Sequence, residues 1–230
     1  MALRNILTWP SQALKKKSSP IVEFDESLIS LTKDLYDTMN VMTGVGIAAP
    51  QIGVHKRVVL VNFEHIADME NPHKSEEYPE NIWVLVNPQL ELSGPKHRWV
   101  EACLSVPDSN GHVERSQYVE LKYQTLEGEE KTCSADWPLS GILQHECDHL
   151  DGVLYIDRMN RMARDMLTKK IVKKRKKMEK MRKLMLQQEK DDLAGVNGSR
   201  RKTTTSNPSK KRKKRPAKKN HLNKKRRKKK

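Results

Sequence analysis

Two histidines flank a glutamate in the segment Gln144-His145-Glu146-Cys147-Asp148-His149. In a helix, residues four apart differ in direction by only about 40°, so His145 and His149 would point the same way and could bind one ion. Glu146 would reach a water on that ion but lies too far around the helix to be a third ligand. Two imidazoles, an adjacent carboxylate and an open coordination position are what metal-assisted hydrolysis requires. The alternative is a chance match, in which two solvated histidines have no function.

Two ligands do not hold a catalytic ion firmly, so a third must come from elsewhere in the chain. The candidates are Cys103, Cys133, Cys147, six other histidines and many acidic residues. Cys147 lies about 200° around the helix from His145, which predicts a packed core thiol. For Cys133 the default expectation is a small buried hydrophobe. Spacing alone does not select Cys103 from the remaining candidates.

A glycine-rich segment, Gly44-Val45-Gly46-Ile47-Ala48-Ala49-Pro50-Gln51, alternates tiny and apolar residues. Small side chains let another backbone approach closely, as when an extended peptide binds along a strand edge. The segment lacks the following basic residue and capped helix of a phosphate loop. Gln51 could donate a hydrogen bond to a developing oxyanion. The alternative is an ordinary glycine-rich turn that leads into a buried segment.

Two helices are predicted in the part of the chain that holds these segments. Apolar residues at spacings of three and four predict a helix from about residue 26 to 42, with Asp25 as its N-cap. The helix that carries the two histidines is predicted to have Asp136 as its cap, Pro138 in its first turn and Gly152 past its end.

Strands are predicted around these helices. Residues 57–63 and 83–87 are dense in Val and Leu and predict buried strands. The loose alternation of residues 113–124, followed by Glu127-Gly128, predicts a hairpin. Residues 64–81 are polar and acidic with two prolines, which is typical of a surface excursion.

The charge of the chain is distributed unevenly. The 230 residues carry a net charge of +16, yet residues 1–165 contain 16 Lys and Arg against 25 Asp and Glu, whereas residues 166–230 contain 29 against 4. We therefore predict a catalytic domain at 1–165, a basic amphipathic C-terminal helix at 166–192 and a disordered Lys/Arg-rich tail at 193–230. So dense a positive charge is expected to bind polyanions at cellular salt.

Composition also limits the compartment. No run of 18 apolar residues occurs, which excludes a membrane span, and the first residues lack the apolar core of a secretory signal. Three cysteines, an odd number, argue against a disulfide scaffold and suit a reducing compartment. We expect a cytoplasmic protein. The methionines from Met159 to Met185 form a rough stripe, which we expect to pack against the catalytic body or a partner helix.

Three segments together resemble the signature motifs of peptide deformylases: GVGIAAPQ at 44–51, EACLS at 101–105 and QHECDHLDG at 144–152. The resemblance extends from about residue 6 to residue 164. It implies an α+β fold in which antiparallel sheets surround a central motif-bearing helix. It also implies removal of the N-formyl group from the initiator methionine of nascent polypeptides, with release of formate.

The resemblance further implies a ligand set. In the family the metal is held by the cysteine of the second motif and both histidines of the third, which correspond to Cys103, His145 and His149. One thiolate and two neutral imidazoles suit Fe²⁺, Zn²⁺, Co²⁺ or Ni²⁺, so the ligand types do not identify the ion. The expectation of Fe²⁺ rests on the resemblance.

The remaining roles follow from the same motifs. Glu146 matches the catalytic glutamate, and Gln51 matches the glutamine that stabilises the oxyanion. Leu104 matches the residue whose backbone N–H joins that oxyanion site. Val45 and Gly46 match the strand-like segment that pairs with the substrate peptide.

One position departs from the family pattern. The second motif usually reads Glu-Gly-Cys-Leu-Ser, and Ala102 replaces its glycine. The added methyl group could crowd the substrate backbone or require a negative φ, so we expect an altered rate or inhibitor affinity rather than inactivity. The resemblance also implies that Glu101 faces an arginine, for which Arg115 is the candidate. The alternative for these two residues is an ordinary surface pair.

The resemblance implies a partner, and two alternative functions remain open. Because the substrate emerges from a ribosome, rRNA or ribosomal proteins are the expected acceptor for the basic region 166–230, and family members dock there through their C-terminal helix. A zincin-type metallopeptidase would need a third His or Glu ligand after the motif helix. A ribosome- or RNA-binding protein with a decayed hydrolase site finds its sole support in Ala102.

Overall fold

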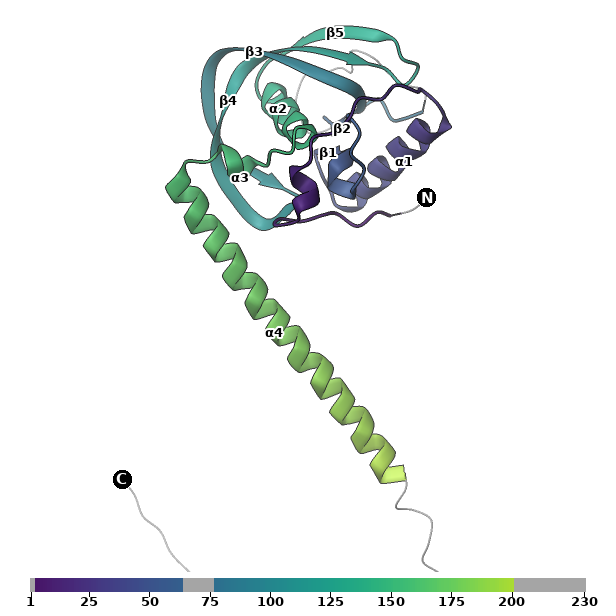
Figure 1. The fold of residues 1–230 in the computed structure, drawn as a ribbon, viewed down its shortest axis with the longest axis vertical. Helices are drawn as coiled ribbons and strands as arrows, with labels where there is room; N and C mark the ends of the chain where they lie inside the picture. Colours follow the sequence, from purple (N-terminus) through teal and green to yellow (C-terminus); the bar gives the residue numbers. More distant parts are fainter. Residues whose placement is uncertain (1–2, 64–76, 201–230) are drawn as a thin grey trace, which may run out of the picture. The chain divides into compact units, whose positions relative to one another are not determined.

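The computed structural model describes residues 3–63 and 77–200 (Figure 1). In chain order the elements are η1 (Gln12–Lys15), α1 (Glu26–Val41), β1 (Gly46–Ala48), η2 (Ala49–Ile52), β2 (Val58–Asn62), β3 (Ile82–Cys103), β4 (Val106–Gln124), β5 (Glu130–Ala135), α2 (Leu139–Leu150), α3 (Tyr155–Arg158) and α4 (Arg161–Arg200). Helices and one antiparallel sheet confirm the predicted α+β class.

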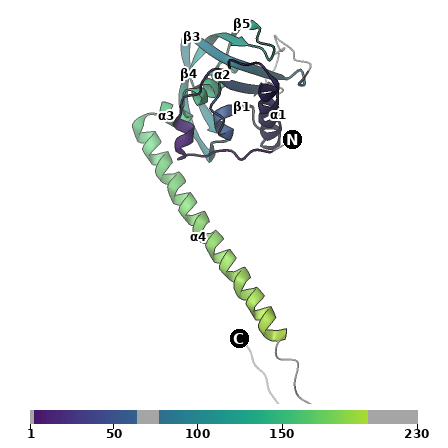
Figure 2. The ribbon, with the colours of Figure 1, turned by 45° about the vertical axis from the view of Figure 1, so that its right-hand side comes forward.

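The five strands form a meander in the order β1-β2-β3-β4-β5, and every neighbouring pair is antiparallel. The sheet curves around α2, which lies in its hollow (Figures 1 and 2). Strands β3 and β4 form a hairpin that ends in the two-residue turn Leu104-Ser105, with Cys103 paired with Val106. The EACLS segment at 101–105 therefore lies at the end of β3 and in the turn of this hairpin.

The apolar side chains of β2 alternate between the two faces of the sheet, and each face packs into a different hydrophobic core. Val58 and Leu60 pack with buried residues of α1, whereas Val59 and Val61 pack with Leu143 and other buried residues of α2. Successive side chains of a strand point to opposite faces, so α1 and α2 cover opposite sides of this part of the sheet. The helix that carries the histidines is thus held by a core of its own.

The two predicted helices are present, and one predicted cap is wrong. Asp25 caps α1, because its carboxylate accepts hydrogen bonds from the backbone N–H groups of Ser27 and Leu28. Asp136 does not cap α2 with its side chain. The Asp136 carboxylate instead accepts a hydrogen bond from the N–H of Trp137 at 2.6 Å, and α2 begins later, at Leu139, with no side-chain cap.

The predicted strands are present, but two are longer than expected. The predicted strand at 83–87 is the buried start of β3, and the predicted strand at 113–124 is the second part of β4. The hairpin between β4 and β5 is confirmed. Of the predicted surface excursion at 64–81, residues 64–76 lie outside the described residues.

The predicted basic helix is part of a longer element. Helix α4 is continuous across the predicted boundaries at 165 and 192 and ends at Arg200, and residues 201–230 lie outside the described residues. The chain divides into two compact units, residues 1–175 and 176–230. Within the described ranges, no helix has the length and apolarity needed to cross a membrane.

Candidate functional site

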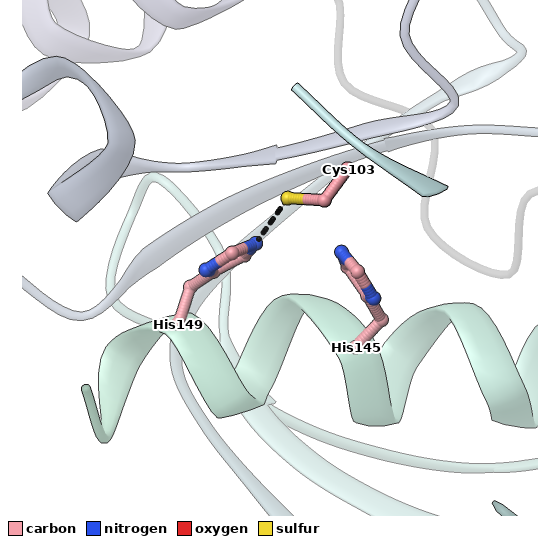
Figure 3. Close-up of side chains that lie close together, drawn as sticks. All are labelled: Cys103, His145 and His149. Atoms are coloured by element: carbon pink, nitrogen blue, oxygen red, sulfur yellow. Dashed lines mark hydrogen bonds between the residues drawn. The ribbon is translucent and has the colours of Figure 1, made fainter. Parts of the chain in front are cut away.

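Three potential ligands from two elements converge on one point. His145 and His149 project from α2 toward Cys103 at the end of β3 (Figure 3). The Cys103 Sγ and His149 Nε2 atoms are 3.3 Å apart, and one donor atom from each of the three residues lies within 4.8 Å of the others. In a tetrahedral site with bonds of 2.0 to 2.3 Å, donor atoms lie about 3.5 Å apart. The cluster therefore has the spacing and the donor types to hold one divalent ion.

Hydrogen bonding orients the His145 ring. Its Nδ1 lies 2.6 Å from Glu101 Oε2, which leaves Nε2 for an ion, and a carboxylate in this position is the usual support of a ligating histidine. Burial lowers the pKa of His145, but hydrogen bonds with Cys103 and Glu101 outweigh it and raise that pKa well above its usual value. Burial lowers the pKa of His149 well below its usual value. An ion that binds both rings must displace the proton on His145.

A buried ionic network supports this arrangement. Arg115 donates to both carboxylate oxygens of Glu101, at 2.7 and 3.0 Å, and to Asp148 at 2.6 Å. Arg158 binds the same Asp148 carboxylate at 2.5 and 3.0 Å. Burial alone would raise the pKa of Glu101, but the hydrogen bonds from His145 and Arg115 lower it to about 2. The Glu101–Arg115 pair is therefore present and buried, and its alternative interpretation as a surface pair is wrong.

Glu146 is placed beside the cluster in a buried environment. Its Oε2 atom has no hydrogen-bond partner among the described residues, and its side chain lines the same cavity as His145 and Cys103. Burial raises the pKa of the Glu146 carboxyl to about 7. A carboxyl group with a pKa near neutrality can both accept and return a proton, which is the property that a general base requires.

Gly46 is in contact with Glu146. A Cβ atom built on Gly46 would lie 2.5 Å from Glu146 Oε1 and 2.7 Å from its Cδ, closer than carbon contacts allow. The glycine of β1 thus makes the room that the carboxylate occupies.

We expect Gly46→Ala to lower kcat roughly 100-fold for the deformylation that the motif resemblance implies, because the new methyl group must displace the carboxylate by about an ångström. Formate release at saturating substrate would measure the effect. Gly44→Ala is the matched control, since the nearest atom to its Cβ would be a flexible Leu104 methyl group at 3.2 Å, with the Gly46 carbonyl oxygen and Met39 Cγ in ordinary contact at 3.4 Å. Equal losses in the two variants would contradict a specific role for the Gly46–Glu146 contact.

Gln51 points its amide group toward Cys103. Its Nε2 donates to Ser105 Oγ at 3.2 Å and lies 3.7 Å from Cys103 Sγ, while its Oε1 accepts from the Ala48 N–H at 2.8 Å. The amide orientation is therefore fixed from both sides. Ser105 also donates its own N–H to Cys103 Sγ at 3.4 Å. Ser105 was not predicted as a site residue, although it belongs to the EACLS segment.

One cavity of about 380 Å³ joins these groups. All the predicted site residues except His149 line it, and His149 lies beside it through its contact with Cys103. Ile142 of α2 also lines this cavity and adds apolar surface to it. Ala102 lines it as well and does not have a positive φ, so the backbone does not require the family's glycine at this position.

The other two cysteines do not join the cluster. Cys147 is buried, as predicted for a core thiol, and borders a different cavity, together with Arg57 and Asp151. Cys133 is half-buried and packs against the core on the α2 side of the sheet. The third donor of the described cluster is Cys103, which precedes the histidines in the chain, whereas a zincin needs a ligand that follows them.

Comparison with known proteins agrees with this geometry. The sequence model of the polypeptide deformylase family matches residues 3–165. A peptide deformylase of Zymomonas mobilis is 38% identical over 175 residues, which cover 76% of this chain and 96% of the relative.

Solved structures give the same result. The crystal structure of a peptide deformylase from Legionella pneumophila is 33% identical, with a TM-score of 0.67, over 77% of this chain and 98% of the other. The crystal structure of a peptide deformylase from Ehrlichia chaffeensis in complex with actinonin is 32% identical, with a TM-score of 0.66, over 76% of this chain and 98% of the other. The chain therefore belongs to the peptide deformylase family and is a hydrolase that removes the N-formyl group from nascent polypeptides.

Proposed function

We propose that Cys103, His145 and His149 hold the catalytic ion and that this ion is Fe²⁺, with Zn²⁺, Ni²⁺ or Co²⁺ as possible substitutes. The converging donor atoms of these three residues carry the proposal. A divalent ion in this site supplies a Lewis acid that activates water and polarises the formyl carbonyl group. The Glu101 carboxylate orients His145 as a ligand through its hydrogen bond to Nδ1.

We propose the following roles for the residues around the ion. Glu146 accepts a proton from the attacking water and passes it to the leaving amine, for which its raised pKa is suited. The Gln51 amide and the backbone N–H of Leu104 stabilise the charge that develops on the formyl oxygen, and such donors are most effective in a dry cavity. Leu104 lies in the turn between β3 and β4, so its N–H is outside the strand ladder.

We also propose that Val45 and Gly46 bind the backbone of the substrate peptide. Gly46 opens the short strand β1, and Val45 precedes it with an exposed side chain. Both residues line the cavity. An extended peptide beside this segment would gain strand-like hydrogen bonds and bring its formyl group to the proposed ion site.

The ligand assignment predicts that Cys103→Ala loses the ion. The full chain purified without oxygen is expected to contain about one iron per chain and to release formate from formyl-Met-Ala-Ser, whereas the variant retains neither property, because two imidazoles alone bind an ion weakly. Metal analysis and formate assay are made on the same samples. Cys133→Ala is the matched control and should keep both. Full metal content in Cys103→Ala would overturn the assignment.

We propose that the basic C-terminal region binds the ribosome, through rRNA or a ribosomal protein, and that the protein acts in the cytoplasm. Five large apolar side chains of α4 beyond residue 175 are exposed among lysines and arginines: Met178, Met181, Leu184, Met185 and Leu186. Residues 201–230 add 17 Lys and Arg and no acidic residue. Such a density of charge favours phosphate backbones.

Deleting residues 201–230 is expected to weaken ribosome cosedimentation at least about tenfold near physiological salt, because the released counterions dominate binding of this kind. Turnover of formyl-Met-Ala-Ser should be unchanged. A tail of equal length with its 17 basic residues replaced by Gln separates the effect of charge from that of length. Cosedimentation equal to that of the full chain in both variants would refute the proposal.

A further inference from the structure

Two tryptophans stand at one side of the active-site cavity. Trp99 of β3 lines the cavity, and its ring meets that of Trp137 edge to face, with centroids 4.6 Å apart and planes at 72°. His97 stacks on the other ring, Trp137, at 4.9 Å. These rings form a rigid aromatic wall, since each is held by contact with the next.

Gly141 makes room for this wall in the first turn of α2. A Cβ atom built on Gly141 would lie 2.9 Å from Trp137 Cζ3 and 3.0 Å from Trp99 Cζ2. Both contacts are with ring carbons, so a side chain at this position would have to displace the indoles. Gly141 is also one residue before Ile142, which lines the cavity itself. The glycine thus lets an indole occupy space that a helical side chain would otherwise fill.

A hydrogen bond fixes the Trp99 ring from its other side. The indole N–H donates to Glu101 Oε1 at 2.9 Å, and Glu101 in turn binds His145. Trp99 and Glu101 lie two apart on β3 and therefore point to the same face of the strand. The position of the indole is in this way tied to the metal-ligand cluster.

The cavity has a polar part and an apolar part. Glu146, Gln51 and Cys103 surround the place where the formyl group must react. Ile142 lies three residues before His145 and four before Glu146, so it shares their face of α2 and borders that place. Trp99 and Ile142 therefore offer apolar surface of the cavity for the first side chain of a formylated peptide.

We propose that Trp99, seated on Gly141 and held by Glu101, sets the depth of the pocket for the first side chain of the substrate. With the indole in place the pocket accepts a slender unbranched side chain such as that of methionine, and it excludes an aromatic side chain by overlap with the ring. Trp99 is the specificity-determining residue, and Gly141 is a positioning residue. The inference rests on the deformylase activity and concerns only the choice of side chain.

The test measures kcat/KM of the metal-loaded full chain for formyl-Met-Ala-Ser and for formyl-Phe-Ala-Ser, and takes the ratio of the first value to the second. Trp99→Leu should lower the ratio of their kcat/KM values at least about tenfold, because a pocket enlarged by several carbon atoms loses discrimination of that order. The Trp99→Phe variant should have a ratio of kcat/KM values between those of the wild type and of Trp99→Leu. The Tyr118→Leu variant, which removes an exposed aromatic ring of the same hairpin, should keep the wild-type ratio.

Gly141→Ala tests the seat of the indole. We expect KM for formyl-Met-Ala-Ser to rise severalfold while kcat stays near its wild-type value, since the reacting groups are untouched. The same substitution should raise KM less in the Trp99→Leu background, where one of the two ring contacts is gone. A substrate ratio unchanged in both Trp99 variants would overturn the proposal. Equal effects of Gly141→Ala in the two backgrounds, measured on variants with wild-type metal content, would overturn the coupling and leave no specificity role for Gly141.

Discussion

Glu146→Gln is expected to lower kcat for formate release by roughly 10³-fold, because general acid-base catalysis contributes factors of this order. The amide has nearly the same shape as the carboxylate, so the contact with Gly46 remains, but it cannot accept the proton of the attacking water. Burial raises the pKa of the wild-type carboxyl to about 7, which makes that exchange favourable near neutral pH. Formate release under saturating substrate, with metal content determined on the same sample, measures the effect.

The control for this prediction must separate chemistry from metal loss. Glu127→Gln removes a carboxylate from an exposed loop and should leave both metal content and turnover unchanged. In Glu146→Gln the metal content should also stay at the wild-type level, since Glu146 is not among the clustered donor atoms. Turnover within tenfold of wild type at full metal content would remove Glu146 from the proposed proton path.

The second large effect is expected from Arg115→Met, which should lower the free energy of unfolding by about 3 to 5 kcal/mol, because it leaves the buried Glu101 carboxylate without its arginine. Arg115 is 3% exposed and binds both Glu101 and Asp148. The substitution should also weaken metal binding, since Glu101 would no longer be held against His145. Urea unfolding and metal titration measure the two effects.

Arg158→Met is the matched control for Arg115→Met. Arg158 binds the same Asp148, but half of its side chain is exposed, so its loss should cost much less stability, about 1 kcal/mol or below. Asp148 would keep Arg115 as its partner, and metal binding should remain unchanged. Equal destabilisation by the two substitutions would show that the burial of the Glu101–Arg115 pair does not determine its contribution.

Local signals in the sequence predicted a large part of this molecule. The spacing of His145 and His149 required only the geometry of one helix, and the cap at Asp25 required only the next few residues. The same reasoning gave a wrong cap at Asp136, because its carboxylate accepts a hydrogen bond from the nearer N–H of Trp137. Caps depend on the local backbone path, which the residue type alone does not determine.

Contacts between distant segments were beyond local signals. Spacing could not select Cys103 as the third donor, since its approach to α2 depends on the length and register of the β3–β4 hairpin. The motif resemblance supplied it instead. The burial of Arg115 and the seat of Trp99 on Gly141 depend on the same hairpin, and the only sequence signal for that seat was a glycine in the first turn of a helix.

The location of Cys103 beside the hairpin turn also restricts where insertions and deletions in β3 can be tolerated. Strand side chains alternate between faces, so adding or removing a single amino acid before Trp99 would invert Trp99, Glu101 and Cys103 together, unless a bulge absorbed it. The β3–β4 pairing already has irregularities at Val86/Gln89, Ser93/Lys96 and Ala102/Cys103. Viable indels should concentrate at the first two places, which precede Trp99, whereas the stretch from Trp99 to Cys103 should keep a constant length because its side chains must stay on one face.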